Sequence, residues 1–232
     1  MKNKHIPFLF LFFLIGCGEN VSPVDAGLDA QIFHFGNGSE PQGLDPHIVT
    51  GVPEHHLLIS MCEGLTIANP KGGENLPGVA ESWTISPDGK TYTFYLNKKA
   101  KWSNGDPLVA DDFVWSWMRI LTPSLGSQYP DMLYYVKGAA DFHQAKTNDF
   151  STVGVKAIND HELQVELKNP TPFFIRLLSH YSTYPVHKET ILKHGSIDDR
   201  NGLWTRPGNF VCNGPMNLKS WELNKQITVE KN

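Results

Sequence analysis

Three histidines near the beginning of the chain are the first residues whose chemistry could matter. His47, His55 and His56 lie close together in the sequence, and imidazole is a common metal ligand. On a helix, however, the neighbouring side chains of His55 and His56 project about 100° apart. One ion would not easily bind both, so we interpret these histidines as solvent-facing and predict no metal site.

Three carboxylates, Asp45, Glu54 and Glu63, lie in the same stretch and could act as acids or bases. The chain has no serine nucleophile elbow, no HExxH motif, no phosphate-binding loop and no dinucleotide fingerprint to accompany them. Carboxylates beside turns commonly accept hydrogen bonds from backbone amides instead. The sequence therefore predicts a protein that is not an enzyme, uses no cofactor, and acts by binding.

The N-terminal segment is typical of a bacterial export signal. Two lysines precede an apolar run over residues 6–15 that is too short to span a bilayer comfortably. The run ends in Leu-Ile-Gly-Cys, which resembles the lipobox of bacterial lipoproteins. We predict a signal peptide over residues 1–16, lipid attachment at Cys17 and a flexible tether over residues 17–29. The alternative is an ordinary secretory signal with an incidental cysteine.

Export bears on the two remaining cysteines, Cys62 and Cys212, which lie far apart in the sequence. Neither has the neighbouring cysteines or histidines that a zinc site needs. An exported protein enters compartments that permit disulfides. The residues leave two alternatives open, one long-range disulfide or two buried free thiols.

Composition limits the class of protein. The chain has 232 residues, of which 40% are hydrophobic and 19% charged, with a formal net charge of −4. These values are typical of a soluble globular protein. Since there is no long basic run, we expect no nucleic-acid partner.

Hydrophobic periodicity predicts a mixture of short strands and helices, hence a mixed α/β or α+β fold. Alternating residues predict strands, and apolar residues at helical spacing predict helices. The predicted strands are residues 31–35, 82–85, 91–96, 162–168, 216–221 and 226–230, and the predicted helices are residues 54–65, 111–121 and 173–178.

A series of short motifs runs in a fixed order along the chain. Each motif alone is a weak pattern, but their order along the chain is specific. They are residues 38–41 (GSEP), 44–46 (LDP), 63–65 (EGL), 77–83 (PGVAESW), 86–94 (SPDGKTYTF), 100–107 (AKWSNGDP) and 112–117 (DFVWSW). Together they resemble the extracytoplasmic solute-binding proteins, family 5, and among them the oligopeptide binders of ABC transporters.

The resemblance implies a fold like that of type II periplasmic binding proteins, in an incomplete form. It places part of the first lobe at residues 30–62, an inserted subdomain at 63–186, and a return to the first lobe at 187–232. Members of the family are about twice as long and have a second lobe. We therefore expect a truncated gene product, or one half of a split protein whose second lobe is separately encoded.

The resemblance also implies binding residues. Thr50, Gly51 and Val52 fall on the stretch that pairs with peptide backbone, Tyr129 falls on a tyrosine that lines the ligand site, and His180 on a nearby histidine. Thr50 departs from the acidic residue expected there. Main-chain pairing of this kind resembles the addition of a strand and tolerates diverse side chains.

The function implied is that of a peptide-binding lipoprotein of an ABC-type oligopeptide importer. Its partners would be short peptides, an ABC permease and, through the lipid, the periplasmic or cell-surface side of a membrane. The alternative is a surface lipoprotein with an adhesive or protein-interaction role. A second departure is Val109 in place of the usual Thr before the helix at 111–121, and Asp111 could take over part of the capping role of that Thr.

Overall fold

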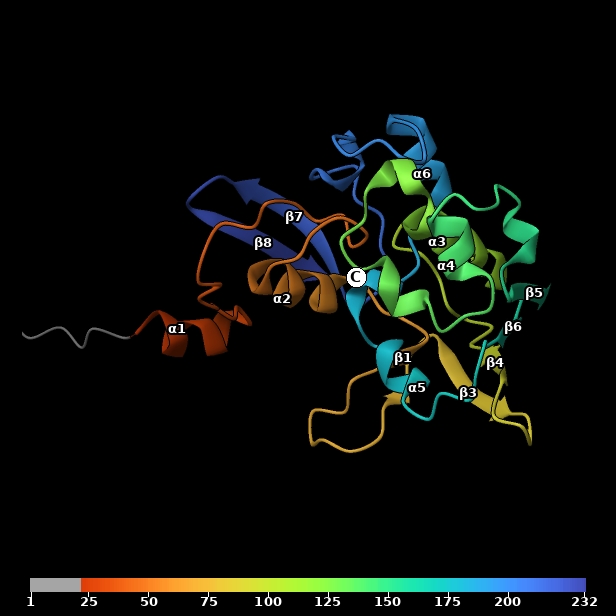
Figure 1. Ribbon diagram of the computed structural model, residues 1–232. Coiled ribbons are helices and arrows are strands. Elements are labelled where there is room, and N and C mark those ends of the chain that lie inside the picture. The colour runs from red at the N-terminus through yellow and green to blue at the C-terminus, as the bar shows by residue number, and fades with distance from the viewer. Residues whose placement is uncertain (1–21) are drawn as a thin grey trace, which may run out of the picture. The chain divides into compact units, whose positions relative to one another are not determined.

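The computed structural model describes residues 22–232 and divides the chain into two units, the first ending at Asn37 and the second beginning at Gly38 (Figure 1). The predicted signal peptide and the lipid attachment residue Cys17 lie outside the described residues. Among residues 22–232, no helix is both long and apolar enough to span a lipid bilayer. The boundaries predicted at 62/63 and 186/187 stay predictions.

In the first unit, α1 (Pro23–Ala30) forms where composition predicted a flexible tether. The hydroxyl of Ser22 accepts a hydrogen bond from the amide of Asp25 at 3.1 Å, and proline occupies the first turn. These are ordinary signals of a helix start. The strand predicted at residues 31–35 is wrong, because no ladder within residues 22–232 includes this stretch and an unpaired segment cannot form a sheet.

The second unit is built around a four-stranded antiparallel sheet of order β3-β4-β6-β5. Its strands are β3 (Ala80–Ile85), β4 (Thr91–Leu96), β6 (Glu162–Glu166) and β5 (Val155–Asn159). The helix α3 (Ala110–Leu121) packs on β5 and β6 (Figure 1). The predicted β3-β4 hairpin, the strand near 162–168 and the helix near 111–121 are thus confirmed.

Asp112, not Asp111, accepts the hydrogen bond from the backbone amide at the N-terminus of α3. Its Oδ2 accepts hydrogen bonds from the amide of Val109 at 2.8 Å and from the indole of Trp102 at 3.2 Å. Val109 has no side-chain oxygen with which to cap the helix in return. The expected role of Asp111 is therefore wrong, since the third helical residue is the one that reaches back to the N-cap amide.

The helix α2 (Val52–Met61) ends four residues before the predicted end at residue 65. At Cys62 the backbone becomes extended, and the amide of Gly214 donates to the carbonyl of Met61 at 2.8 Å. A segment that returns from far along the chain thus supplies the hydrogen-bond donor for the last carbonyl of α2. It continues into the hairpin of β7 (Met216–Glu222) and β8 (Gln226–Lys231), which confirms the two strands predicted there.

The remaining elements are short and connect these parts. They are the strands β1 (Thr66–Ile67) and β2 (Leu76–Pro77), the helices α4 (Ala139–His143), α5 (Phe174–Leu177) and α6 (Lys188–His194), and the 3-10 helices η1 (Pro123–Leu125), η2 (Pro130–Leu133), η3 (Phe150–Thr152), η4 (Tyr181–Thr183) and η5 (Leu203–Thr205).

Two principal hydrophobic clusters fill the second unit. The larger lies between the sheet and α3 and includes Phe94, Trp117 and Val165. The smaller joins α2 to η4 and β7 and includes Leu58 and Leu218. The predicted binding residues belong to segments that pack around this smaller cluster.

Candidate functional site

The predicted binding residues meet at the beginning of α2. Thr50 and Gly51 precede the helix and Val52, which is 65% exposed, begins it. The hydroxyl of Tyr129 donates to the carbonyl of Thr50 at 3.4 Å. The ring of His180 meets that of Tyr129 edge-on, with 5.1 Å between centroids. Three segments that are distant in the sequence therefore converge on one short stretch of backbone.

Tyr181 is a member of this group that sequence reasoning missed. Its ring stacks on His180 with 4.3 Å between centroids, and its hydroxyl donates to the carbonyl of Val49 at 3.0 Å. Burial, together with Tyr129 and Glu54 nearby, raises the pKa of the Tyr181 hydroxyl, so the group stays a hydrogen-bond donor. Its position next to His180 in the chain was the one signal that could have identified it.

The surroundings of His180 favour its neutral imidazole form. Its Nδ1 lies 2.8 Å from the hydroxyl of Ser182 and accepts from the Ser182 amide at 3.3 Å. Burial first, and then His55, lower the pKa of His180, while Asp131 opposes them. Because Nδ1 accepts from an amide, the proton of the neutral ring is on Nε2.

In the backbone of residues 49–51 all three carbonyls are occupied, whereas the amides of Thr50 and Gly51 are available. Val49 and Thr50 accept from the two tyrosines, and the carbonyl of Gly51 accepts from the amide of His55 at 3.1 Å. Within residues 22–232, the amides of Thr50 and Gly51 donate to no other group. Such amides can bind the carbonyl groups of an extended peptide.

A buried ion pair holds the turn that leads into this segment. Arg119 of α3 donates to both oxygens of Asp45, at 2.9 and 2.6 Å, and to the carbonyl of Ile197 at 2.9 Å. Burial alone would raise the pKa of Asp45, but the Arg119 guanidinium and its hydrogen bonds hold that pKa below its usual value. The carbonyl of Asp45 accepts from the amide of Val49. This pair was the second feature that sequence reasoning missed.

His47 completes this buried group as an uncharged member. Its Nε2 lies 3.1 Å from the carbonyl of Tyr184 and its Nδ1 lies 3.1 Å from the Arg119 guanidinium. Burial and the positive charge of Arg119 lower the pKa of His47 to about 4. The expectation that His47 faces solvent is therefore wrong, since the side chain is buried against a cation.

The loop of residues 37–46, NGSEPQGLDP, is held by its own carboxylate. Glu40 accepts from the indole of Trp221 at 2.6 Å and from the amide of Asn224 at 3.0 Å, so the loop is tied to the β7-β8 hairpin. Further along, the amide of Gln42 donates to Oε1 of Glu54 at 2.6 Å. The loop is thus attached both to the hairpin and to the beginning of α2.

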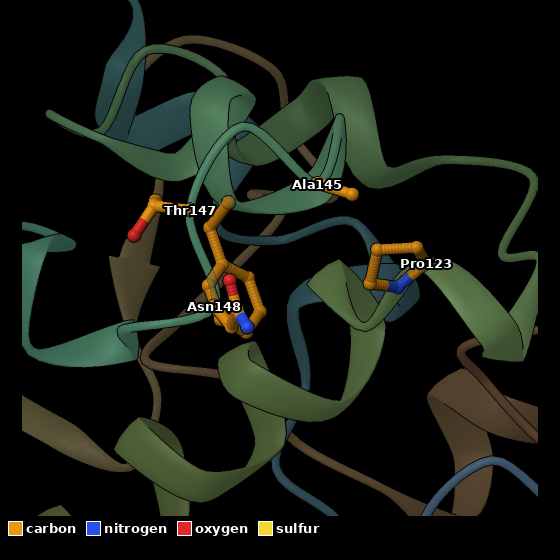
Figure 2. Close-up of a pocket in the computed structure, with 5 residues that line it drawn as sticks. Pro123, Ala145, Thr147 and Asn148 are labelled. Carbon is orange, nitrogen blue, oxygen red and sulfur yellow. The ribbon is translucent and has the colours of Figure 1, made fainter.

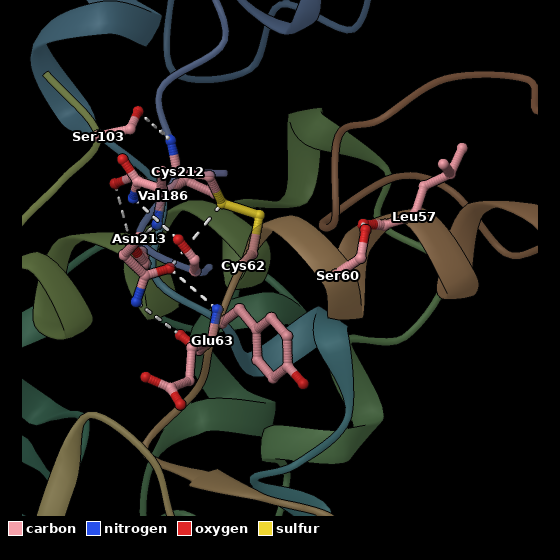
Figure 3. Close-up of a disulfide and its surroundings, with 12 residues drawn as sticks. Leu57, Ser60, Cys62, Glu63, Ser103, Val186, Cys212 and Asn213 are labelled. Carbon is pink, nitrogen blue, oxygen red and sulfur yellow. Dashed lines mark hydrogen bonds between the residues drawn. A yellow bond between two sulfur atoms is a disulfide. The ribbon is translucent and has the colours of Figure 1, made fainter. Parts of the chain in front are cut away.

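A disulfide between Cys62 and Cys212 secures the other end of α2 (Figure 3). Of the two alternatives for these cysteines, the long-range disulfide is therefore the one that the structure has, and not two free thiols. Their Cα atoms are 5.3 Å apart. Next to it, Asn213 accepts from the amide of Glu63 at 3.0 Å and donates to the carbonyl of Glu63 at 2.9 Å. Covalent and hydrogen bonds therefore fix the helix end to the returning segment.

A small hollow elsewhere in the second unit has a volume of about 130 Å³. Figure 2 shows side chains of mixed character around it. It is lined by Pro123, Phe142, Ala145, Thr147 and Asn148. None of the predicted binding residues takes part, so the hollow is separate from the group at the beginning of α2.

Comparison with known proteins supports the resemblance. The model of the family "Bacterial extracellular solute-binding proteins, family 5 Middle" matches residues 75–232. The chain is 45% identical over 197 residues to the periplasmic oligopeptide-binding protein OppA of Escherichia coli. This alignment covers 84% of this chain and 35% of OppA. The chain is 39% identical over 196 residues to OppA of Bacillus subtilis, covering 84% and 34%. The chain thus spans about a third of the length of these relatives.

A solved structure agrees with the sequence comparison. The crystal structure of Haemophilus influenzae OppA in complex with the peptide RPPGFSPFR matches with a TM-score of 0.78 and 38% identity, over 84% of this chain and 37% of that one. The predicted mixed α/β fold of periplasmic binding proteins is thereby confirmed for the part covered. The chain belongs to the bacterial extracellular solute-binding proteins of family 5.

Proposed function

We propose that this chain supplies one wall of a peptide-binding site and works as the peptide-capturing component of an ABC-type oligopeptide importer. The observation that carries the proposal is the segment of residues 49–51, whose carbonyls are held by Tyr181, Tyr129 and the first turn of α2 while two amides stay available. A peptide in extended conformation would pair with this segment through its own backbone. Thr50, Gly51, Val52, Tyr129 and His180 would contact it.

The opposite face of the peptide would be contacted by a second lobe outside these residues. The length of the relatives supports this part of the proposal. A ligand held between two lobes loses most of its exposed surface, whereas one wall alone provides only part of the contacts. The second lobe would close over the bound peptide and present it to a membrane permease.

Attachment to a membrane through lipidated Cys17 would keep the protein beside its permease. Diacylation together with amide acylation gives a durable anchor, because a single acyl chain binds a membrane only weakly. Labelling with tritiated palmitate in a bacterial host should give a radioactive chain. The Cys17→Ala variant should stay unlabelled, and equal labelling of both chains would contradict the proposed anchor.

Thermal unfolding of residues 18–232, with and without a saturating pool of short peptides, tests the binding. A ligand present at a hundred times its dissociation constant adds about 2.7 kcal/mol to the free energy of unfolding. An upward shift of a cooperative transition is the expected result. An unchanged transition would show that this chain does not capture peptides by itself.

A further inference from the structure

Glu54 is the most unusual group near the candidate site. It lies in the first turn of α2, yet it is only 3% exposed. Its Oε1 accepts from the amide of Gln42 at 2.6 Å. Its Oε2 is also buried and has no hydrogen-bond partner among the described residues. A buried acceptor without a donor destabilises a fold, so its presence calls for a physical reason.

Gly51 lies directly against this carboxylate. A Cβ added at Gly51 would overlap Oε2 and would lie 2.8 Å from the Cδ of Glu54. The backbone at Gly51 has φ −88° and ψ 159°, which any residue can adopt. A side chain at this position would therefore displace the Glu54 carboxylate, although the backbone conformation itself would accept one.

Glu54 consequently joins two parts of the site. One oxygen holds the loop of residues 37–46 through Gln42, and the other fills the space beneath the Cα of Gly51. The two tyrosines fix the neighbouring carbonyls of Val49 and Thr50. Tyrosine hydroxyls and carboxylate together restrain the segment while its amides stay available.

We propose that Glu54 is a positioning residue that holds the backbone of Thr50 and Gly51 in the conformation required for pairing with a ligand. This inference rests on the proposed peptide binding. The carboxylate acts through Gly51 and Gln42 and does not touch the ligand. Its shape and its hydrogen bond to Gln42 matter, whereas its negative charge does not.

Four variants of the purified chain separate these contributions. Glu54→Ala removes both the hydrogen bond and the volume, and Glu54→Gln keeps both without the charge. Gly51→Ala pushes the carboxylate away, and the double variant Gly51→Ala/Glu54→Ala gives the new Cβ the vacated space. Asp111→Ala, which removes an exposed acid from the first turn of α3, is the matched control.

Two measurements apply to each variant, namely hydrogen exchange at the Gln42 amide, which donates to Glu54, and affinity for the probe peptide trialanine by calorimetry. Glu54→Ala should accelerate exchange at the Gln42 amide and weaken trialanine binding, each by about tenfold. Glu54→Gln and the control should match the wild type. Gly51→Ala should weaken binding, and the double variant should recover part of that loss, because the two changes are coupled through one contact.

Three outcomes would overturn either the positioning role of Glu54 or the proposed peptide binding. Unchanged exchange and affinity in Glu54→Ala would overturn the positioning role. Equal losses in Glu54→Gln and Glu54→Ala would overturn it too, because the charge itself would then be the essential feature. Failure of the wild-type chain to bind trialanine would overturn the proposed peptide binding by this chain, while exchange at the Gln42 amide would still decide whether Glu54 holds the loop next to the segment.

Discussion

Removing the disulfide between Cys62 and Cys212 should destabilise the fold substantially. The bond closes a loop with a sequence separation of 150. For a loop of that length, the chain-entropy model gives a stabilisation of about 5 kcal/mol, and native disulfides commonly contribute about 2–5 kcal/mol. This is a large part of the ~5–15 kcal/mol that stabilises a typical domain. We therefore expect the Cys62→Ala/Cys212→Ala variant to lose about 2–5 kcal/mol of unfolding free energy.

Urea denaturation followed by tryptophan fluorescence measures this loss. With a slope of about 2–3 kcal/mol per molar urea, the midpoint should decrease by about 1–2 M. Wild-type protein reduced with dithiothreitol serves as a second comparison, since it lacks the bond without any substitution. Reduction should be slow while the protein is folded, because both cysteines are buried.

Two results would refute this reasoning. The first is an equal urea midpoint for the oxidised wild type and the alanine variant at the same slope. The second is rapid alkylation of both cysteines by iodoacetamide in unfolded protein that was never exposed to a reductant. Either result would mean that the bond is not present or does not constrain the unfolded chain.

Three further predictions concern stability. Arg119→Met leaves the Asp45 carboxylate buried without its partner and should lower the free energy of unfolding by about 3–5 kcal/mol. In urea denaturation, the Asp45→Asn/Arg119→Met variant should recover part of that loss, and equal losses would contradict a pairing effect. Stability should also decrease with acidification, because the pKa of His47 is lowered from 6.5 to about 4 in the fold, so the unfolded state binds more protons between these values. The contribution of His47 to the free energy of unfolding is complete above pH ~6.5, and on the order of 3 kcal/mol of it is lost towards pH ~4. If the urea midpoint of His47→Gln changed with pH in the same way as that of the wild type, this explanation would be wrong. Val109→Thr should supply the missing helix cap of α3 and add about 1 kcal/mol, seen as a higher thermal midpoint.

Local sequence signals predicted the sheet and α3 well. The β3-β4 hairpin has alternating residues around a Ser-Pro-Asp-Gly turn, and α3 has an apolar stripe, so each pattern contains the information for its own element. The end of α2 could not be predicted in this way. It is set by Gly214 and by the disulfide partner Cys212, which the chain brings back from far along the sequence.

The site was predictable only in part for the same reason. Tyr129 and His180 were found through resemblance to a family, but the partner of Asp45 was not. In the sequence, Arg119 occupies a helical position where an arginine usually faces water. Its burial depends on Asp45, which lies 74 positions earlier, and no local pattern contains that relation.

The two principal hydrophobic clusters of the second unit differ in how far apart in the sequence their residues lie. All buried residues of the larger cluster come from one continuous stretch between Leu65 and Leu178. The smaller cluster requires Leu44 and Leu218 to meet. Contacts between residues distant in the sequence form slowly, because more chain entropy is lost before they are made. We therefore expect the sheet with α3 to be complete first on refolding, and the segment that would pair with a ligand to be among the last to form.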